Sequence, residues 1–155
     1  MIPSKPLQRG FYFEEFEVGQ EIVTAGRTVV ESDVYGFAGI SGDFTQIHTD
    51  AEFSRTTAFG QRVAHGLLGL SIASGLAMRT GVLEGTVLAF REINDWKFIK
   101  PVFIGDTLHV EMEVKELKPM PRIGGGQALV ALDVKNQKNE TLMRGTLAVL
   151  VASKP

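Results

Sequence analysis

The 155-residue sequence contains no cysteine. Disulfide bonds, thiolate metal sites and cysteine-based catalysis are therefore excluded, and a reducing compartment suits the chain. The sequence also lacks an excess of either charge, because 16 basic and 18 acidic residues give a formal net charge of -2. This balance gives no support for binding to nucleic acid or to an anionic membrane surface.

Long hydrophobic runs are missing as well. The first ten residues, MIPSKPLQRG, lack the apolar segment of a signal peptide. The stretch from Gly66 to Met78 carries no charged side chain, but its 13 residues are fewer than the roughly 20 that cross a bilayer. No membrane segment is expected, and the expected location is cytoplasmic.

The sequence predicts a single domain over residues 1–155, with residues 1–10 as an N-terminal arm. A hydrophobic content of 44% suits a sizeable core, and no repeat or low-complexity linker divides the chain. Residues 21–30 have the β-branched content of a first strand. A short helix is expected to begin at Ser32 or Asp33, where either side chain can cap it, and to break at 41–43.

The middle of the chain predicts a buried helix over residues 63–80, after a loop that contains a short helical turn. This segment is apolar nearly all round, whereas a surface helix shows a polar face. Its glycine, alanine and serine residues allow neighbouring backbone to approach closely.

The second half of the chain changes to the two-residue period of β-strands. The predicted strands share alternating or β-branched side chains and cover residues 87–98, 108–117, 128–135 and 141–151. Residues 136–139 are predicted to be a turn, and the glycines at 124–126 a flexible hairpin tip, since no helix follows them as in a phosphate-binding loop. The expected fold class is α+β, with about five mostly antiparallel strands curved around one buried helix.

The segment from Asp33 to Ser74 holds the polar groups best suited to chemistry, and Asp43 with His48 is the pair that we select. A carboxylate and an imidazole that flank one water can move protons to and from it. The two residues are five positions apart, ~500° along a helix, so a helix would separate their side chains. A loop started by Gly42 can instead bring them together.

These residues resemble a known motif. The run SGDFTQIH at 41–48 is similar to the hydratase motif SGDxNP[aliphatic]H of the MaoC-like dehydratases, the (R)-specific enoyl-CoA hydratases. A second block of that family, FGxx[aliphatic]AHG[aliphatic]L, is matched from Phe59 to Leu68, and residues 100–108 continue the likeness weakly. Two positions depart, because Thr45 replaces the usual Asn and Gln46 the usual Pro. The departures concern how the loop is held and which acyl chain fits.

The resemblance implies a hot-dog fold and a hydro-lyase of fatty acid metabolism that adds water to trans-2-enoyl-CoA to give (3R)-3-hydroxyacyl-CoA. In this family Asp43 and His48 would hold the water, and the backbone N–H of Gly66 would receive the thioester oxygen. The hydroxyl of Ser74 matches a supporting position. The resemblance also implies a homodimer, no cofactor apart from the CoA of the substrate, and no metal. Which of the pair is the acid and which the base stays open.

The other histidines and Asp50 have simpler expected roles. His65 precedes the buried helix and is expected to cap it or to bond a carbonyl, and His109 lies on the polar face of a strand, where solvent should reach it. Asp50 is expected to cap the following turn. His48, Asp50 and His65 have side chains of the types that bind metals, but their spacing in the sequence fits no standard ligand pattern.

Other reactions are less well supported. Neither Ser71 nor Ser74 lies in the GxSxG turn of a serine nucleophile. A thioesterase on the same fold is an alternative and would release free CoA, whereas hydration releases none. A non-catalytic acyl-CoA-binding subunit is the third hypothesis.

Overall fold

A computed structural model describes residues 8–155. The first seven positions of the predicted N-terminal arm lie outside the described residues. The arm's end is fixed, because the N–H groups of Gly10 and Phe11 donate to the carbonyls of Gly81 and Val82 at 2.9 and 2.6 Å. The strands are β1 (Glu21–Val23), β2 (Arg27–Thr28), β3 (Val87–Phe98), β4 (Thr107–Met120), β5 (Gly125–Lys135) and β6 (Thr141–Ala152). The helices are α1 (Glu31–Ser41), α2 (Gln46–Thr49), α3 (Ala51–Arg55) and α4 (Gly66–Arg79), with 3₁₀ turns η1 (Phe13–Glu15) and η2 (Pro121–Ile123).

The strands form an antiparallel sheet in the order β1-β4-β5-β6-β3, with β2 also paired to β4. The sheet therefore has six strands where about five were expected. The predicted strand at 21–30 was wrong as one element, since it breaks between β1 and β2. At the break, the side-chain oxygen of Thr24 accepts from the N–H of Val110 at 2.9 Å and takes the place of a backbone partner.

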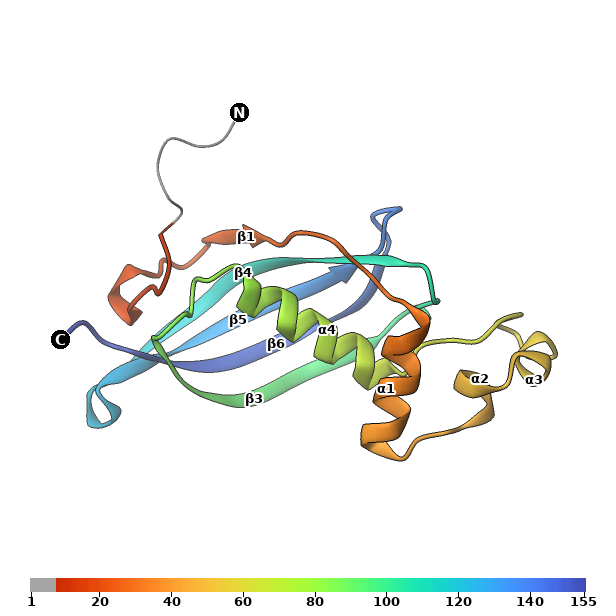
Figure 1. Ribbon diagram of the computed structural model, residues 1–155. Helices are drawn as coiled ribbons and strands as arrows, with labels where there is room; N and C mark the ends of the chain where they lie inside the picture. Colours follow the sequence, from red (N-terminus) through yellow and green to blue (C-terminus); the bar gives the residue numbers. More distant parts are fainter. Residues whose placement is uncertain (1–7) are drawn as a thin grey trace.

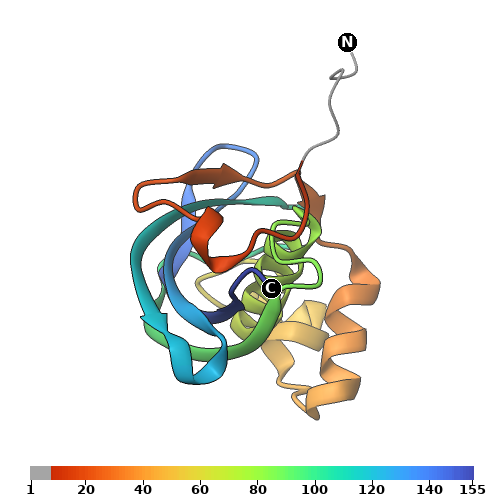
Figure 2. The ribbon, with the colours of Figure 1, turned by 90° about the vertical axis from the view of Figure 1, so that its left-hand side faces the viewer.

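Helix α4 lies in the curve of the sheet, as Figures 1 and 2 show from two sides. The face of α4 that is turned to the sheet is buried through Ile72, Ala73 and Leu76. The small residue Gly69 allows this contact, because a Cβ there would lie 2.7 Å from the terminal methyl of Met143 on β6. The prediction that this helix is buried on all sides was wrong for the single chain, since Leu67 is 60% exposed and Met78 is 42% exposed. The expected α+β fold around one central helix is confirmed.

The two predicted connections in the second half had different outcomes. The turn at 136–139 is confirmed, with the N–H of Asn136 donating to the carbonyl of Glu140 at 3.1 Å. The flexible tip at 124–126 was wrong for two of its three glycines, because Gly125 and Gly126 are buried in β5 and pair with β6. Side chains at these positions would collide with the backbone of Val151 and the ring of Phe13, so packing accounts for both glycines.

Helices α1 to α3 project beyond one end of the sheet (Figure 1), and we call residues 31–62 the overhang. Arg62 fastens its two ends together, because its guanidinium donates to both carboxylate oxygens of Glu31 at 2.7 and 2.6 Å. The Arg62 hydrogen bond holds the pKa of Glu31 below its ordinary value. The same guanidinium lies 5.9 Å from the ring centroid of Tyr35. Among the helices within residues 8–155, none combines the length and apolar character that a membrane crossing needs.

Candidate active site

The loop that carries Asp43 begins where α1 ends. Gly42 caps the helix in a left-handed conformation with φ of 77°, which glycine adopts without strain. The hydroxyl of Ser41 donates to the carbonyl of Phe37 at 2.7 Å and accepts from the N–H of Asp43 at 3.1 Å. The predicted break at 41–43 is confirmed, and it directs Asp43 away from the helix axis.

Thr45 orients the carboxylate of Asp43. Oδ1 accepts the backbone N–H of Thr45 at 3.1 Å and its hydroxyl at 2.5 Å, while Oδ2 lies 3.8 Å from Nε2 of His48. The two hydrogen bonds from Thr45, and then the nearby imidazoles of His48 and His65, hold the pKa of Asp43 below its ordinary value. Thr45, a departure from the family motif, thus provides a direct hydrogen bond to Asp43.

Replacing Thr45 by Val should raise the pKa of Asp43 towards the ordinary value of 3.8. The variant removes the hydroxyl bond, which is the largest cause of the lowered pKa, and keeps the backbone N–H bond. The measurement is an NMR titration of the Asp43 carboxyl carbon. In the wild type, the lowered pKa of Asp43 adds to the free energy of unfolding. This contribution is complete above the unfolded-state pKa of Asp43 and is lost as the pH falls through its lower folded-state pKa. In Thr45→Val this loss should occur at higher pH, and an unchanged Asp43 titration would contradict the assigned cause.

His48 lies on α2 and is 7% exposed. Its Nδ1 is 2.7 Å from the carbonyl oxygen of Val63, which can only accept, so Nδ1 carries the proton. In the neutral ring, Nε2 therefore presents its lone pair, and Nε2 is the atom nearest Asp43. The predicted convergence of Asp43 and His48 is confirmed as geometry, with Asp43 in the loop after α1 and His48 on the short helix α2.

His65 lies directly against this pair. Its Nε2 is 2.8 Å from the backbone carbonyl oxygen of Asp43, and its ring stacks on that of His48 with 3.8 Å between centroids. The expectation that His65 bonds a carbonyl is confirmed, while its side chain makes no capping bond to α4. Its contact with His48 could not be read from the sequence.

Gly66 is the first residue of α4, and its N–H donates to no backbone or side-chain acceptor in the described part of the chain. Free N–H groups and the helix dipole make this helix end favourable for negative charge. Gly66 and His48 both line a cavity of about 550 Å³. The rest of its lining is mostly apolar and consists of Ile47, Phe59, Val63, Ala64, Leu67, Phe98, Ile99, Lys100, Pro101, Val102 and Met143.

The structure does not bring Ser74 to the Asp43–His48 pair within one chain. Ser74 follows Gly66 by eight residues on α4, which is ~12 Å along the helix axis. No hydrogen bond joins Ser74 to either residue in the region that the structure describes. Ser71 donates to the carbonyl of Leu67 at 2.8 Å, so its hydroxyl is engaged within its own helix.

Three side chains are close enough to suggest a metal site, but the trio is Asp43, His48 and His65, with ligand atoms within 4.8 Å of one another. Asp50 is outside it and accepts the N–H of Phe53 at 2.9 Å, which confirms the expected cap. The imidazoles of His48 and His65 are stacked with 25° between planes, and each has one nitrogen bonded to a carbonyl. Lone pairs in nearly parallel rings do not converge on one ion. The absence of a metal stays a prediction.

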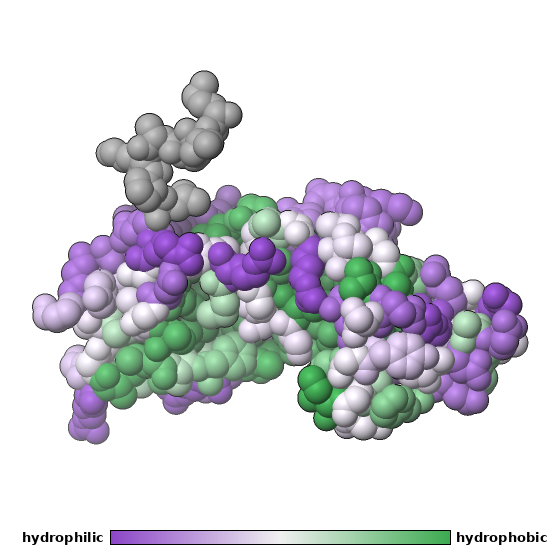
Figure 3. All heavy atoms as spheres, in the orientation of Figure 1, coloured by the Kyte–Doolittle hydropathy of each residue, from purple (hydrophilic) through white to green (hydrophobic). Residues whose placement is uncertain are grey.

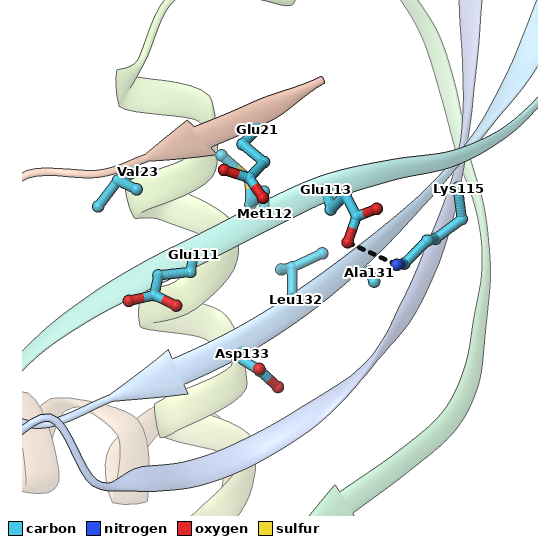
Figure 4. A pocket seen from close by; sticks show the side chains of 9 residues that line it. All are labelled: Glu21, Val23, Glu111, Met112, Glu113, Lys115, Ala131, Leu132 and Asp133. Atoms are coloured by element: carbon cyan, nitrogen blue, oxygen red, sulfur yellow. Dashed lines mark hydrogen bonds and ion pairs between the residues drawn. The ribbon is translucent and has the colours of Figure 1, made fainter. Parts of the chain in front are cut away.

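A second large concavity lies on the face of the sheet turned away from α4 (Figure 4). It has a volume of about 460 Å³ and carries charged side chains from β1, β4 and β5. Glu113 pairs with Lys115 at 2.5 Å and Glu111 with Lys135 at 2.6 Å, so the pKa of Glu111 is lowered mainly by the Lys135 bond. His109, 3.8 Å from Glu111, is partly exposed on the polar face of β4, so solvent reaches it as expected. This surface is a network of ion pairs, and the carboxylate nearest to His109 is already bonded to Lys135.

The chain is similar in sequence to known proteins. Residues 14–136 match the MaoC-like domain family. The chain belongs to this family. It is 34% identical over 153 residues to a 3-hydroxybutyryl-CoA dehydratase of Methylorubrum extorquens, a match that covers 90% of this chain and 95% of that protein. It is 38% identical over 104 residues to Protein MaoC of Klebsiella aerogenes, covering 67% of this chain but only 30% of that longer protein.

Solved structures agree with this assignment. A monoamine oxidase regulatory protein from Archaeoglobus fulgidus is 36% identical with a TM-score of 0.88, covering 96% of this chain and 98% of that one. An R-hydratase from Pseudomonas aeruginosa is 31% identical with a TM-score of 0.78, covering 94% and 88%. A Mycobacterium tuberculosis protein described as a double hot-dog fold is 20% identical, has a TM-score of 0.83 and matches over 94% of this chain and 45% of that one. The MaoC-like chain described here has the hot-dog fold.

Proposed function

We propose that this MaoC-like protein is a hydro-lyase that reversibly hydrates trans-2-enoyl-CoA to (3R)-3-hydroxyacyl-CoA. The observation that carries the proposal is the 3.8 Å separation of Asp43 Oδ2 and His48 Nε2, beside an apolar cavity lined by His48 and by Gly66, whose N–H has no partner among residues 8–155. The relatives that are named dehydratase and R-hydratase support the reaction class and the stereochemistry.

The geometry suits the addition of one water molecule. Asp43 Oδ2 and His48 Nε2 both accept hydrogen bonds, so a water between them is held with its oxygen free to attack C3. One of its protons passes to the pair and a proton returns to C2, so the product contains the whole water molecule. Negative charge grows on the thioester oxygen during attack, and the amide of Gly66 at the helix end is placed to stabilise it. The reaction uses no cofactor and no metal.

A hydration assay with crotonyl-CoA tests the proposal. Loss of the ultraviolet absorbance of the conjugated thioester measures the reaction, and chiral analysis of the product tests the 3R assignment. EDTA should leave the rate unchanged. Free thiol should not appear, and the chain itself gives no thiol background because it lacks cysteine. Thiol release identifies a thioesterase, and binding without turnover across a series of chain lengths identifies a binding subunit.

We also propose a homodimer joined through β3. This strand forms one edge of the sheet and pairs only with β6 in the described chain. Figure 3 shows hydrophobic residues gathered over this part of the surface. Phe90 is 50% exposed, Leu88 49% and Ile93 44%. A long apolar edge of this kind is an aggregation hazard unless something covers it, and a second copy in edge-to-edge contact would do so.

Phe90→Lys should convert the dimer to a monomer, because a charged side chain opposes pairing of the apolar edge. Light scattering coupled to size-exclusion chromatography measures the mass. Val18→Lys is the matched control, since Val18 is 65% exposed but lies outside β3. A wild-type chain that is monomeric and fully active would overturn the dimer proposal.

A further inference from the structure

We infer that His65 is a positioning residue that fixes Asp43 and His48 relative to each other. The inference rests on the proposed hydration reaction and assigns a part in it to a side chain that contacts both Asp43 and His48. His65 bonds the backbone of Asp43, stacks on the ring of His48 and is the direct neighbour of Gly66 in the chain. It joins residues that are 22 and 17 positions away in the sequence to the start of α4.

The link to Asp43 matters because the loop at 42–45 has no helix or strand to support it. Its hydrogen bonds, as far as the described residues show, otherwise stay within positions 38–49. The bond from His65 Nε2 to the Asp43 carbonyl is the one that ties this loop to the buried helix. The side chain of Asp43 is 45% exposed, so its direction depends on how firmly its backbone is held.

The stacking of His65 on His48 restricts the orientation of the His48 ring. Its bond to Val63 fixes the Nδ1 end, but a ring held at one edge can still rotate about that bond. The ring of His65 lies at 3.8 Å from it with 25° between the planes, so it blocks rotation on that side. Together the two contacts direct Nε2 of His48 towards Asp43. Catalytic groups need this support, since a displacement of 1 Å can cost about 10²-fold in rate.

A purely structural role does not suit a histidine here. His65 is 3% exposed, and its Nδ1 is buried without a hydrogen-bond partner among residues 8–155. The ring of Phe37 lies on it at 4.9 Å between centroids, so the surroundings are partly apolar. A buried, unsatisfied ring nitrogen lowers stability, whereas a phenylalanine has no such atom. Retaining histidine at this position is consistent with a function that depends on its N–H group.

The experiment compares three variants in the full-length protein. His65→Phe keeps a ring against His48 but cannot donate to Asp43. His65→Gln places an amide nitrogen the same number of bonds from Cα as Nε2, and so restores the donor without the stack. His109→Phe is the matched control, since that histidine lies on β4, outside the site. Steady-state hydration of crotonyl-CoA gives kcat and KM, and thermal unfolding gives Tm.

We expect His65→Phe to lower kcat by about 10²-fold with little change in KM, while Tm stays within about 4 °C of the wild-type value. His65→Gln should recover part of kcat, and His109→Phe should match the wild type. Combined with Asp43→Asn, His65→Phe should cause little further loss, because both changes act on the same groups. A folded His65→Phe with wild-type kcat, or a fully multiplicative double variant, would overturn the inference.

An inert wild type would refute the proposed reaction, and a readout that needs no turnover then tests His65 itself. NMR titration should show the pKa of Asp43 raised in His65→Phe, since the loop that bonds its carboxylate is loosened and the His65 imidazole is gone. His65→Gln should restore most of the lowered value. If His65→Phe does not fold, the comparison of His65→Gln with the wild type remains. An Asp43 titration that is the same in the folded His65 variants as in the wild type would exclude the positioning role.

Discussion

Replacing Asp43 by Asn is expected to lower kcat for crotonyl-CoA hydration by about 10³-fold. Acid–base groups typically contribute about 10² to 10⁴ in rate, and the amide of Asn can neither accept a proton from water nor carry the negative charge. The change is nearly isosteric, and the Oδ1 that accepts both bonds from Thr45 remains. The loop geometry should therefore survive. His48→Asn should have an effect of similar size, because it removes the Nε2 lone pair that faces Asp43.

Asp50→Asn is the matched control for this prediction. Asp50 lies two residues beyond His48 and caps α3 through the N–H of Phe53. Asn caps helices about as well as Asp, so this variant removes one negative charge near the site and keeps the fold. It should retain wild-type kcat. If the Asp43→Asn and His48→Asn proteins are folded and both keep full activity, the Asp43–His48 pair is not the source of catalysis.

The elements that could be predicted from the sequence are those whose periodicity is local. The alternation along 108–114 and the apolar run from Gly66 reflect burial of one strand face and of most of a helix, and both elements are present. The boundary error at the start of α4 has a local cause. Val63 and Ala64 make backbone contacts with other segments, including a bond from the Ala64 N–H to the Val102 carbonyl at 2.8 Å, and so do not join the helix.

The parts that could not be predicted depend on contacts between distant segments. The sequence around Gly125 and Gly126 predicts a flexible tip, because it does not show that β6 and Phe13 pack against these two glycines. The stacking of His65 on His48 joins α2 to the start of α4, and no spacing rule indicates it. The apolar cavity draws its wall from the overhang, α4, β3, β6 and the residues before β4, so its shape could not be inferred from any one of them.

Gly66→Pro is expected to lower kcat by about 10²-fold or more, while Gly66→Ala keeps most of it. Gly66 occupies the first position of α4, where its N–H has no partner in the described chain and where proline is well tolerated. The preceding residue, His65, has φ of -59° and ψ of 137°, an extended conformation that suits a residue before proline. Proline therefore removes the N–H with little change to the helix. Loss of one oxyanion donor typically costs about 10² to 10³ in kcat.

Gly66→Ala makes this comparison decisive because it separates the N–H from the bulk of the side chain. A Cβ at position 66 would lie 2.9 Å from the ring of Phe98 in either variant, and that ring belongs to a side chain that is 54% exposed and has room to shift. Any loss due to this contact is common to Ala and Pro, so the difference in kcat between them reports the loss of the N–H together with the ring carbons that take its place. Thermal unfolding and circular dichroism should show α4 intact in both. Equal kcat in two folded variants would show that the thioester oxygen does not use the amide of Gly66.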